Sequence, residues 1–373
     1  MRRPIPATGL HAHAAGRASR RGAPVFPKAW IFSFRCRSNG RSLGENDRRG
    51  GTLPLLLACL ALAACGPAAK GPDLVFISDE TANVVHVVDG ASGTVEGEMK
   101  TGARPRGMAR SPDGRTLYVA ASNANRIEAW DVRSRRRLRS YPSGSDPERF
   151  VVSPDGRMLY VANEDHSAVS FLNLASGRVV REVKVGAEPE GMGISPDGRL
   201  LVATSEAAST AHFIDAGSGR LIDSVMVGSR PRDVLFLQGG RQVWVSSEQR
   251  GTISVIDSRT RRILRTIDLV AAFPDVDPAQ AVEMEVTRDG SRAFVAMGRG
   301  NQVAEIDPAS GKIVRAFPTG ERNWGLALSP DERRLYAASG LSGDLTIIDL
   351  RANKVLRHVR FAGRPWGVEA VAR

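Results

Sequence analysis

An acidic residue recurs at a nearly constant interval along most of the chain. It closes a short run rich in Val and Ile, and it stands at six positions: Asp89, Asp131, Asp215, Asp257, Asp307 and Asp349. Asn173 fills the one gap, so the successive steps are 42, 42, 42, 42, 50 and 42 residues. A regular period of this length predicts a chain built from seven copies of one structural unit.

One unit, residues 153–186, shows what is repeated. Three strand-like runs, Met158–Asn163, Ala168–Asn173 and Val179–Val185, are rich in Val, Leu and aromatic residues. The turn residues Pro154–Gly156 and Ala175–Gly177 separate this unit's runs from their neighbours. Units of 40 to 45 residues with four strands each are typical of β-propellers. The sequence therefore predicts an all-β fold, a seven-bladed β-propeller of four-stranded antiparallel blades.

The ends of the repeated region predict how the ring closes. The first repeat begins at Leu74 with a second strand, whereas the last stops at Pro365–Val371, which is a first strand without its turn. We therefore expect the C-terminal strand to complete the first blade of a propeller over residues 73–373, which protects the strand edges. The alternative, an open solenoid, would need polar capping repeats, and neither end shows one.

The positive charge of the chain lies mostly before the repeats. The net charge is +12, but residues 1–65 hold eleven Lys and Arg against two acidic residues, which leaves the remainder near +3. No basic stripe or recognition motif for nucleic acid occurs in the repeats. We therefore expect no nucleic-acid partner.

The segment before the repeats has the form of an export signal. Residues 48–65 combine a basic start, the apolar run Leu53–Ala64 and small residues before Cys65. That run is too short to span a bilayer and is typical of a secretory signal peptide. Residues 1–47 are interpreted as an extended or non-native leader, which we expect to be disordered, and residues 66–72 as a linker.

The end of that segment, Leu62-Ala63-Ala64-Cys65-Gly66, resembles the bacterial lipobox. The resemblance implies that Cys65 is lipidated and that the protein is anchored at the periplasmic face of a bacterial membrane. Gly66 at the next position favours the outer membrane. An ordinary cleaved signal with an incidental Cys is the alternative.

The loops at one end of a propeller channel are the expected place for function. Connections from fourth to first strands and from second to third strands meet on that face, the channel mouth. Arginines gather there near two tryptophans that we expect to be exposed, opposite an acidic sector, which is typical of a binding site. A solvated rim of exposed ion pairs is the alternative. The candidate binding residues are Arg104, Arg106, Glu148, Glu190, Arg232, Arg322, Trp324, Arg364 and Trp366.

The repeats show no catalytic motif. We expect no cofactor and no metal; the residues that come nearest to a metal group are His166, Glu164 and Glu206, which lack a Cys or a spaced His pair. Aromatic residues occupy one repeat position and are expected to pack between blades. They are Phe76, Tyr118, Tyr160, Trp244, Phe294 and Tyr336.

The repeat unit resembles the YVTN family of β-propellers. The resemblance is carried by Gly186–Gly198 and by Val245–Glu248 with Thr252–Asp257. More narrowly, Glu188–Gly198, Ala211–Asp215 and Arg364–Val368 look like the propellers associated with pyrroloquinoline-quinone-dependent alcohol catabolism. That resemblance implies an exported protein beside quinoprotein dehydrogenases, with no assignable reaction.

These observations together predict an exported, membrane-tethered, monomeric propeller without catalytic activity. It would act as a binding or scaffold protein whose mouth face recognises a periplasmic protein partner, such as a quinoprotein dehydrogenase system. The alternative is a lactonase-like hydrolase or a propeller that binds haem or another cofactor.

Overall fold

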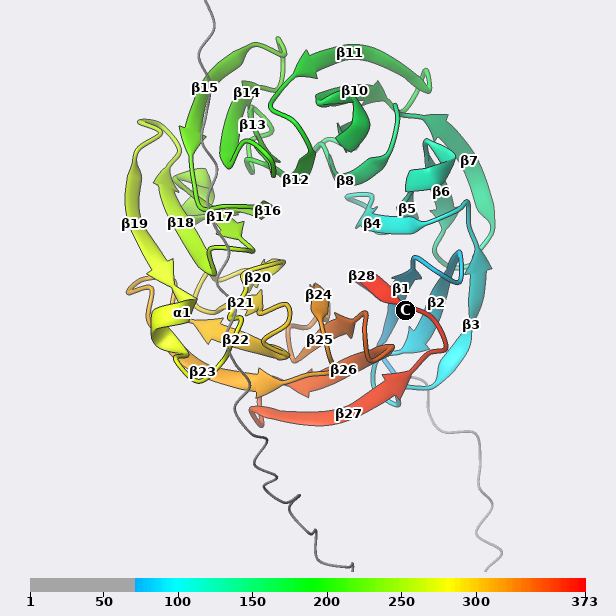
Figure 1. The fold of residues 1–373 in the computed structure, drawn as a ribbon. Helices are drawn as coiled ribbons and strands as arrows, with labels where there is room; N and C mark the ends of the chain where they lie inside the picture. Colours follow the sequence, from blue (N-terminus) through cyan, green and yellow to red (C-terminus); the bar gives the residue numbers. More distant parts are fainter. Residues whose placement is uncertain (1–70) are drawn as a thin grey trace, which may run out of the picture. The chain divides into compact units, whose positions relative to one another are not determined.

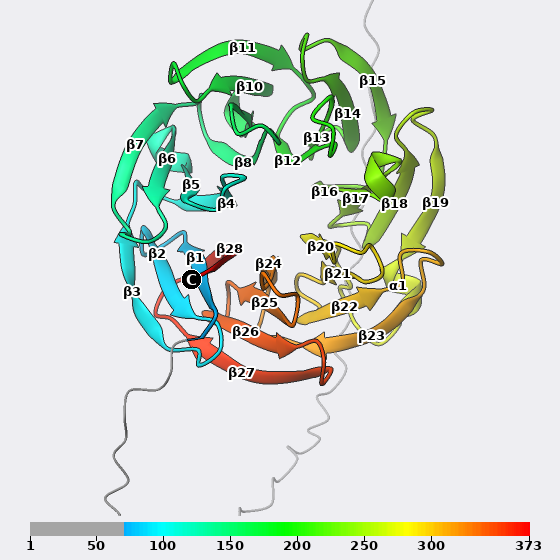
Figure 2. The ribbon, with the colours of Figure 1, turned by 180° about the vertical axis from the view of Figure 1, so that it is seen from behind.

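The computed structural model describes residues 71–373, in which seven four-stranded antiparallel sheets stand around a central channel (Figure 1). Figure 2 shows the same ring from behind. The predicted all-β, seven-bladed propeller is thus confirmed. The segments expected to be leader and signal peptide, and the proposed lipidation site Cys65, lie outside the described residues. Within the described range no helix is long and apolar enough to cross a membrane.

Each blade is numbered by its place in the chain, and its strands run from the channel outwards. Blade 1 consists of β28 (Pro365–Ala372), β1 (Asp73–Asp79), β2 (Val84–Asp89) and β3 (Val95–Lys100). Blade 2 consists of β4 (Pro105–Arg110), β5 (Thr116–Ala121), β6 (Arg126–Asp131) and β7 (Arg137–Pro142). Blade 3 consists of β8 (Pro147–Val152), β9 (Met158–Asn163), β10 (Ala168–Asn173) and β11 (Arg178–Lys184). Blade 4 consists of β12 (Pro189–Ile194), β13 (Leu200–Ser205), β14 (Thr210–Asp215) and β15 (Leu221–Met226).

The other three blades follow the same order. Blade 5 consists of β16 (Pro231–Leu237), β17 (Gln242–Ser247), β18 (Thr252–Asp257) and β19 (Ile263–Asp268). Blade 6 consists of β20 (Met284–Val286), β21 (Ala293–Ala296), β22 (Gln302–Ile306) and β23 (Ile313–Pro318). Blade 7 consists of β24 (Asn323–Leu328), β25 (Arg334–Ser339), β26 (Asp344–Asp349) and β27 (Lys354–Arg360). Short helices interrupt the connections: η1 (Ser122–Ala124), η2 (Glu164–His166), η3 (Gln238–Gly240) and α1 (Leu269–Ala272).

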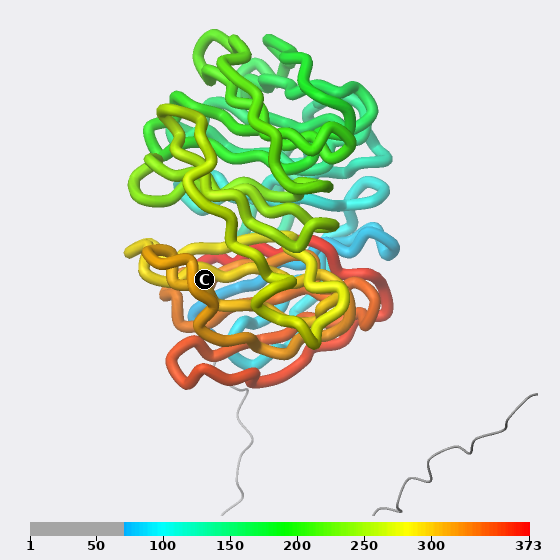
Figure 3. The backbone as a smooth tube through the Cα atoms, turned by 60° about the vertical axis from the view of Figure 1, so that its left-hand side comes forward, coloured from blue at the N-terminus to red at the C-terminus, as the bar shows by residue number. Residues whose placement is uncertain are grey.

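The two ends of the propeller complete one sheet, as the repeat count predicts. β28 pairs antiparallel with β1, with Leu74 opposite Val371 and Ile77 opposite Val368. Figure 3 shows the red C-terminal segment running beside the blue start of the propeller. Every inner strand therefore has a neighbour on its outer side, and β1 has no free edge.

The core lies between neighbouring blades, because the middle strands are buried on both faces. β10 is buried along nearly its whole length, whereas β11 on the rim exposes most of its side chains. Trp244 of blade 5 packs in one cluster with Val295 of blade 6. The aromatic residues at this repeat position are all buried, which confirms their predicted packing role: Phe76, Tyr118, Tyr160, Trp244, Phe294 and Tyr336.

Arginines on the outer strands join several blades at the rim. Arg139 of β7 donates from Nη2 to the carbonyl oxygen of Ser176, in the turn of the next blade, at 3.3 Å. Gly177 in that turn has a φ of 71°, and a Cβ built there would lie 2.1 Å from Arg139 Nη2. A glycine at this turn thus leaves room for the guanidinium. Equivalent arginine contacts to the next blade are made by Arg181, Arg265 and Arg357.

The two faces of the ring differ in their connections. The mouth face carries the connections from fourth to first and from second to third strands, and the turn face carries the connections from first to second and from third to fourth strands. The long step in the repeat lies between β19 and β20, where α1 and the residues after it add to the mouth face (Figure 1).

Candidate functional site

The predicted binding residues lie where the inner strands begin, at the mouth of the channel. Arg104 and Arg106 lead into or belong to β4, and Trp366 belongs to β28. The same place in other blades is taken by Glu148, Glu190, Arg232 and Trp324. The regular repeat brings these positions to one face, because each inner strand begins after the same kind of connection from the fourth strand of the preceding blade.

Blades 2 and 3 share a charged group centred on Glu148, whose side chain is 1% exposed. Arg104 Nη1 lies 2.9 Å from Asp146 Oδ1 and 3.0 Å from Glu148 Oε1. Arg106 Nε lies 3.2 Å from Glu148 Oε2, and its Nη1 is 3.5 Å from Glu80 Oε2. Two guanidinium groups are thus held against one buried carboxyl.

Glu164 of η2 extends this group into a carboxylate trio of Asp146, Glu148 and Glu164. One oxygen of each lies within 4.8 Å of the others. Glu164 is only partly buried, and its carboxyl makes no hydrogen bond or ion pair with any described residue. Burial raises the pKa of Glu164, and so do the nearby carboxylates. Burial also raises the pKa of Glu148, against the attraction of Arg106.

Blades 4 and 5 share a second charged group around Arg232. This arginine is 5% exposed and contacts Glu190 and Glu206, and its Nε lies 3.1 Å from Glu248 Oε2. Arg322 of blade 7 approaches the same Glu248 with an Nη2–Oε1 distance of 2.9 Å. The interpretation as a solvated rim is corrected here, since these ion pairs are buried rather than exposed at the rim.

The two tryptophans lie beneath the arginines. Their ring centroids are 6.3 Å apart, with an interplanar angle of 28°. Arg106 Cζ lies 4.8 Å from the ring centroid of Trp366, and Arg322 Cζ lies 4.1 Å from that of Trp324. Trp366 is 2% exposed, so it supports the arginines and does not offer the exposed ring expected from the sequence. Arg364 is exposed, and its guanidinium has no partner among the described residues.

The residues considered for a metal are not gathered. His166 is exposed, with Nε2 3.4 Å from Ser145 Oγ. Glu206 is held by Arg230 and Arg232. Within residues 71–373, Glu164 instead joins Asp146 and Glu148, and that trio already faces the guanidinium groups of blade 2.

Sequence reasoning missed three charged residues inside the channel. Arg149 of blade 3, Asp233 of blade 5 and Glu283 of blade 6 form a channel strut: Arg149 Nη1 lies 2.8 Å from Glu283 Oε1 and 3.8 Å from Asp233 Oδ1. Backbone amides of Met284 and Leu326 also donate to the two carboxylates. The other four blades carry Gly at this repeat position, so a comparison of the copies could have found the strut: Gly107, Gly191, Gly325 and Gly367.

The blade 2–3 group combines the parts that acid–base chemistry requires. Glu164 supplies a carboxyl with a raised pKa and no partner, and Arg104 and Arg106, which are paired with the neighbouring Glu148, supply positive charge. Glu148 holds both arginines in place from below. This is the arrangement that can activate water and stabilise a developing oxyanion.

Comparison with known proteins places the chain among propellers. The model of the YNCE-like β-propellers matches residues 65–197, and that of the choice-of-anchor I domain matches residues 164–339. No curated protein matches the chain.

Several solved structures share the fold. The periplasmic gluconolactonase of Pseudomonas aeruginosa is 24% identical, with a TM-score of 0.67 over 80% of this chain and 99% of that one. A putative 6-phosphogluconolactonase of Bacteroides fragilis is 16% identical, with a TM-score of 0.67 over 82% of this chain and 100% of that one. A dihydro-haem d1 dehydrogenase is 17% identical, with a TM-score of 0.61 over 79% of this chain and 74% of that one.

These neighbours correct the functional expectation. Two are described as lactonases and the third as a dehydrogenase, so the prediction of a scaffold without catalytic activity was wrong. The narrower resemblance to quinone-associated propellers is not shown by any of these matches. The chain is a seven-bladed β-propeller, similar over part of its length to the YNCE-like β-propellers.

Proposed function

We propose that the protein is a lactonase-like hydrolase that opens small lactones at the mouth face. The observation that carries the proposal is the unpaired Glu164 carboxyl beside Arg104 and Arg106. The lactonase titles of two structural neighbours support the choice of reaction.

The proposed reaction uses Glu164 first as a base. Ionised Glu164 accepts a proton from a water molecule as the water oxygen attacks the lactone carbonyl carbon. The carbonyl oxygen takes up negative charge beside the guanidinium groups of Arg104 and Arg106, which stabilise it. Because these groups are already held by Glu148, little reorganisation is needed when the charge develops.

The second step reverses the proton transfer. The tetrahedral intermediate collapses with cleavage of the ring C–O bond, and protonated Glu164 returns its proton to the departing oxygen. The product is a hydroxy acid, which ionises and releases a proton to solvent. Water is the only co-reactant, so the atoms balance without a cofactor.

The other enzymatic alternative, a haem-binding propeller, has less support from the site. Haem iron takes an axial His, Met, Cys or Tyr, usually within an apolar pocket. On the mouth face of residues 71–373, His166 is exposed and lies next to Ser145 and the charged blade 3 loops. The donor set and its surroundings favour hydrolysis over haem binding.

The direct test is hydrolysis of D-glucono-δ-lactone in a pH-stat, with the spontaneous rate subtracted. Glu164→Gln keeps the shape of the side chain but cannot accept the proton, so kcat should fall about a hundredfold or more. KM should change much less, since the arginines remain. A wild-type protein without activity, or Glu164→Gln with normal kcat, would overturn the proposal.

The matched control is Glu188→Gln. Glu188 lies on the same face, in the connection between β11 and β12 that leads into blade 4, but it is exposed and its carboxyl forms no hydrogen bond or ion pair with described residues. This variant should retain the wild-type kcat. If Glu188→Gln lowered kcat as much as Glu164→Gln does, the loss of any carboxylate on the mouth face would lower kcat, and Glu164 would have no special role.

We also propose that hydrolysis takes place outside the cytoplasm. The signal-like segment 48–65 supports export, and one structural neighbour is described as periplasmic. Fractionation of cells that express the full chain, with and without Cys65→Ala, tests export and lipid attachment together.

A further inference from the structure

The innermost strands depart from the repeat at three charged positions near the turn face. The last residue of β4 is Arg110. Glu285 of β20 and Glu369 of β28 stand at the repeat position one residue before that of Arg110. At the Arg110 position the other six blades carry only apolar residues: Val152, Ile194, Phe236, Val286, Leu328 and Ala370. At the position of the two glutamates the other five blades carry Ala109, Val151, Gly193, Leu235 and Ala327. Because the other blades fold with uncharged residues at these positions, the fold does not require the three charged side chains, and we look for a function that does.

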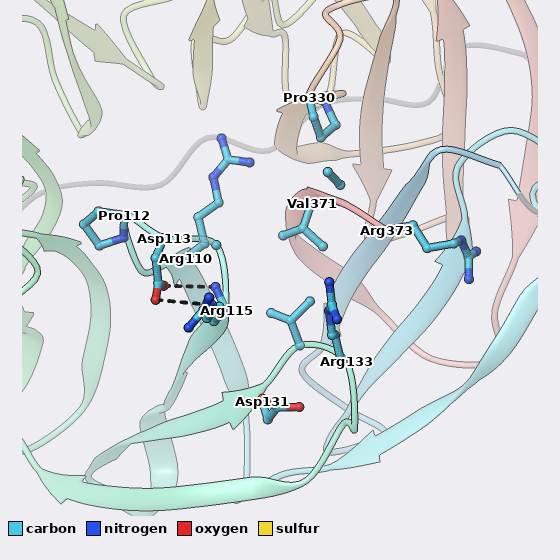
Figure 4. Close-up of a pocket in the computed structure, with 12 residues that line it drawn as sticks. Arg110, Pro112, Asp113, Arg115, Asp131, Arg133, Pro330, Val371 and Arg373 are labelled. Carbon is cyan, nitrogen blue, oxygen red and sulfur yellow. Dashed lines mark hydrogen bonds and ion pairs between the residues drawn. The ribbon is translucent and has the colours of Figure 1, made fainter.

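All three departures line two adjoining cavities on the turn face. The turn-face cavity, of about 640 Å³, is bounded by Arg110, the turns of blade 2 and the end of β28 (Figure 4). A second cavity of about 350 Å³ is lined by Glu285 and Glu369, and the two cavities share Arg110 and Pro330. The larger volume is typical of a site for a small organic ligand.

The arginines of the turn-face cavity have unused hydrogen-bond donors. Arg110 donates one bond, from Nη1 to the carbonyl oxygen of Ala370 at 2.8 Å. The guanidinium of Arg133 has no hydrogen bond or ion pair with any described residue, and Figure 4 shows Arg133 among the side chains that line the cavity. Arg373 points away in Figure 4 and is paired with Asp89. Two guanidinium groups therefore remain available to an anion.

The two carboxylates in the lining are already committed to turns. Asp113 accepts a hydrogen bond from Ser111 Oγ at 2.6 Å, and Asp131 accepts one from the backbone amide of Ser134 at 2.7 Å. These bonds hold both aspartates in the turns and lower their pKa values. The aspartates consequently offset only part of the arginine charge.

The adjoining cavity supplies a different chemistry. Burial raises the pKa of Glu369 to about 7 and that of Glu285 well above its usual value. At neutral pH such carboxyl groups can donate as well as accept hydrogen bonds. Hydroxyl groups are suitable partners for them.

We infer that the turn-face cavity is a binding site for a small hydroxylated organic anion, such as a sugar acid or a sugar phosphate. Its anionic group pairs with Arg110 and Arg133, and its hydroxyl groups reach Glu285 and Glu369. This site is distinct from the lactone site, because the channel strut of Arg149, Asp233 and Glu283 crosses the channel between them. It does not rest on the proposed hydrolysis.

Methyl NMR tests the site directly, since Val132, just after the end of β6, and Val371, near the end of β28, line the cavity at the ends of these strands that are far from the mouth. Sodium gluconate and glucose 6-phosphate are the probes, and neutral glucose is the comparison. At least one of the two anions should shift both valine resonances saturably at millimolar concentration or below. A response to gluconate alone assigns a carboxylate, and a response to glucose 6-phosphate alone assigns a phosphate.

The repeat itself supplies variants that the fold accepts. Arg110→Val introduces the residue of blade 3, and Arg133→Ala introduces that of the equivalent turn in blade 1, Ala91. The double variant should bind the responding anion about tenfold more weakly or worse, while its circular dichroism and lactone hydrolysis stay unchanged. Absence of shifts with both anions, an equal response to glucose, or undiminished binding by the double variant would each overturn the inference. If wild-type protein bound the anion but did not hydrolyse lactones, only the proposed function would be contradicted.

Discussion

Arg149 Nη1 lies 2.8 Å from Glu283 Oε1, although the two residues come from blades on different sides of the channel. β8 and β20 face each other across the opening in Figure 1. Asp233 lies 3.8 Å from the same guanidinium nitrogen, and Arg149 Cζ lies 4.8 Å from the ring centroid of Trp366. One arginine thus ties three blades and the mouth tryptophan together, and the channel is closed by charge pairing at this level.

Removing Arg149 should destabilise the propeller. In Arg149→Met, Glu283 and Asp233 would remain in the channel without their counter-ion, and an unpaired buried charge costs about 3–5 kcal/mol of unfolding free energy. Urea unfolding followed by tryptophan fluorescence measures the loss. The triple variant Arg149→Met, Asp233→Asn, Glu283→Gln has no unpaired charge and should be more stable than the single variant. A triple variant as unstable as Arg149→Met would contradict the charge explanation.

Closure of the ring by β28 should be essential for stability. Val371 is 2% exposed and lies opposite Leu74, so Val371→Asp would bury a charge at the seam between the two ends. We expect a loss of several kcal/mol, on the scale of other unpaired buried charges of about 3–5 kcal/mol. Differential scanning calorimetry compares it with Val95→Asp on the outer strand of the same blade, where Val95 is 44% exposed. Equal melting temperatures for the two variants would count against the closed ring.

Glu369 should make the protein less stable as the pH rises from about 4.5 to about 7. Its pKa is raised to about 7 by burial, from 4.5, so in this range the folded state holds a proton that the unfolded state has released. The unfolding free energy therefore falls with increasing pH, by on the order of 1–3 kcal/mol after discounting for its partial exposure. Glu369→Ala, which introduces the residue of blades 2 and 7, should reduce this fall. An unchanged pH dependence in denaturant unfolding would show that Glu369 titrates normally.

Gly177→Ala should weaken the junction between blades 2 and 3. The φ of 71° disfavours a side chain by about 1–2 kcal/mol, and the added Cβ would collide with Arg139 Nη2. Unfolding free energies of Gly177→Ala, Arg139→Ala and the double variant separate the two effects. The double variant should be more stable than the sum of the single losses predicts, because the collision disappears. Simple additivity would mean that the arginine moves aside without cost.

The pH dependence of lactone hydrolysis should report on Glu164. The base must be ionised, so kcat/KM should fall as the pH drops through the pKa of Glu164, which lies above the usual value of 4.5. The pH-stat assay from acidic to neutral pH gives this midpoint. A midpoint at or below the usual glutamate value would indicate another base.

The arrangement of the blades could be predicted because the repeat carries it. The spacing of Asp89 to Asp349 defines the number of blades, and the incomplete repeats at Leu74 and Pro365 define the seam. The same repeat positions also predicted that the candidate binding residues lie at the channel mouth. Their burial did not: Trp366 was expected to be exposed, but Arg106 and Arg149 cover its ring.

The chemistry of the candidate site could be predicted only in part. The sequence indicated Glu148, Arg104 and Arg106 by their repeat position, but grouped Glu164 with His166 and not with the arginines. Orientation of the loop at η2 decides that pairing, because Glu164 turns towards Asp146 while His166 remains exposed. The sequence predicted a functional site only at the channel mouth, so the cavity at Arg110 on the turn face was not expected.

The sequence by itself determined the seven blades and the join between the two ends, because strand pattern and turn residues are local and recur at a fixed interval. Only the tertiary structure decided which charges meet. Arg149 and Glu283 are 134 residues apart in the chain. Their contact depends on the curvature of the whole ring, which brings distant inner strands to one axis and has no local signature in either repeat.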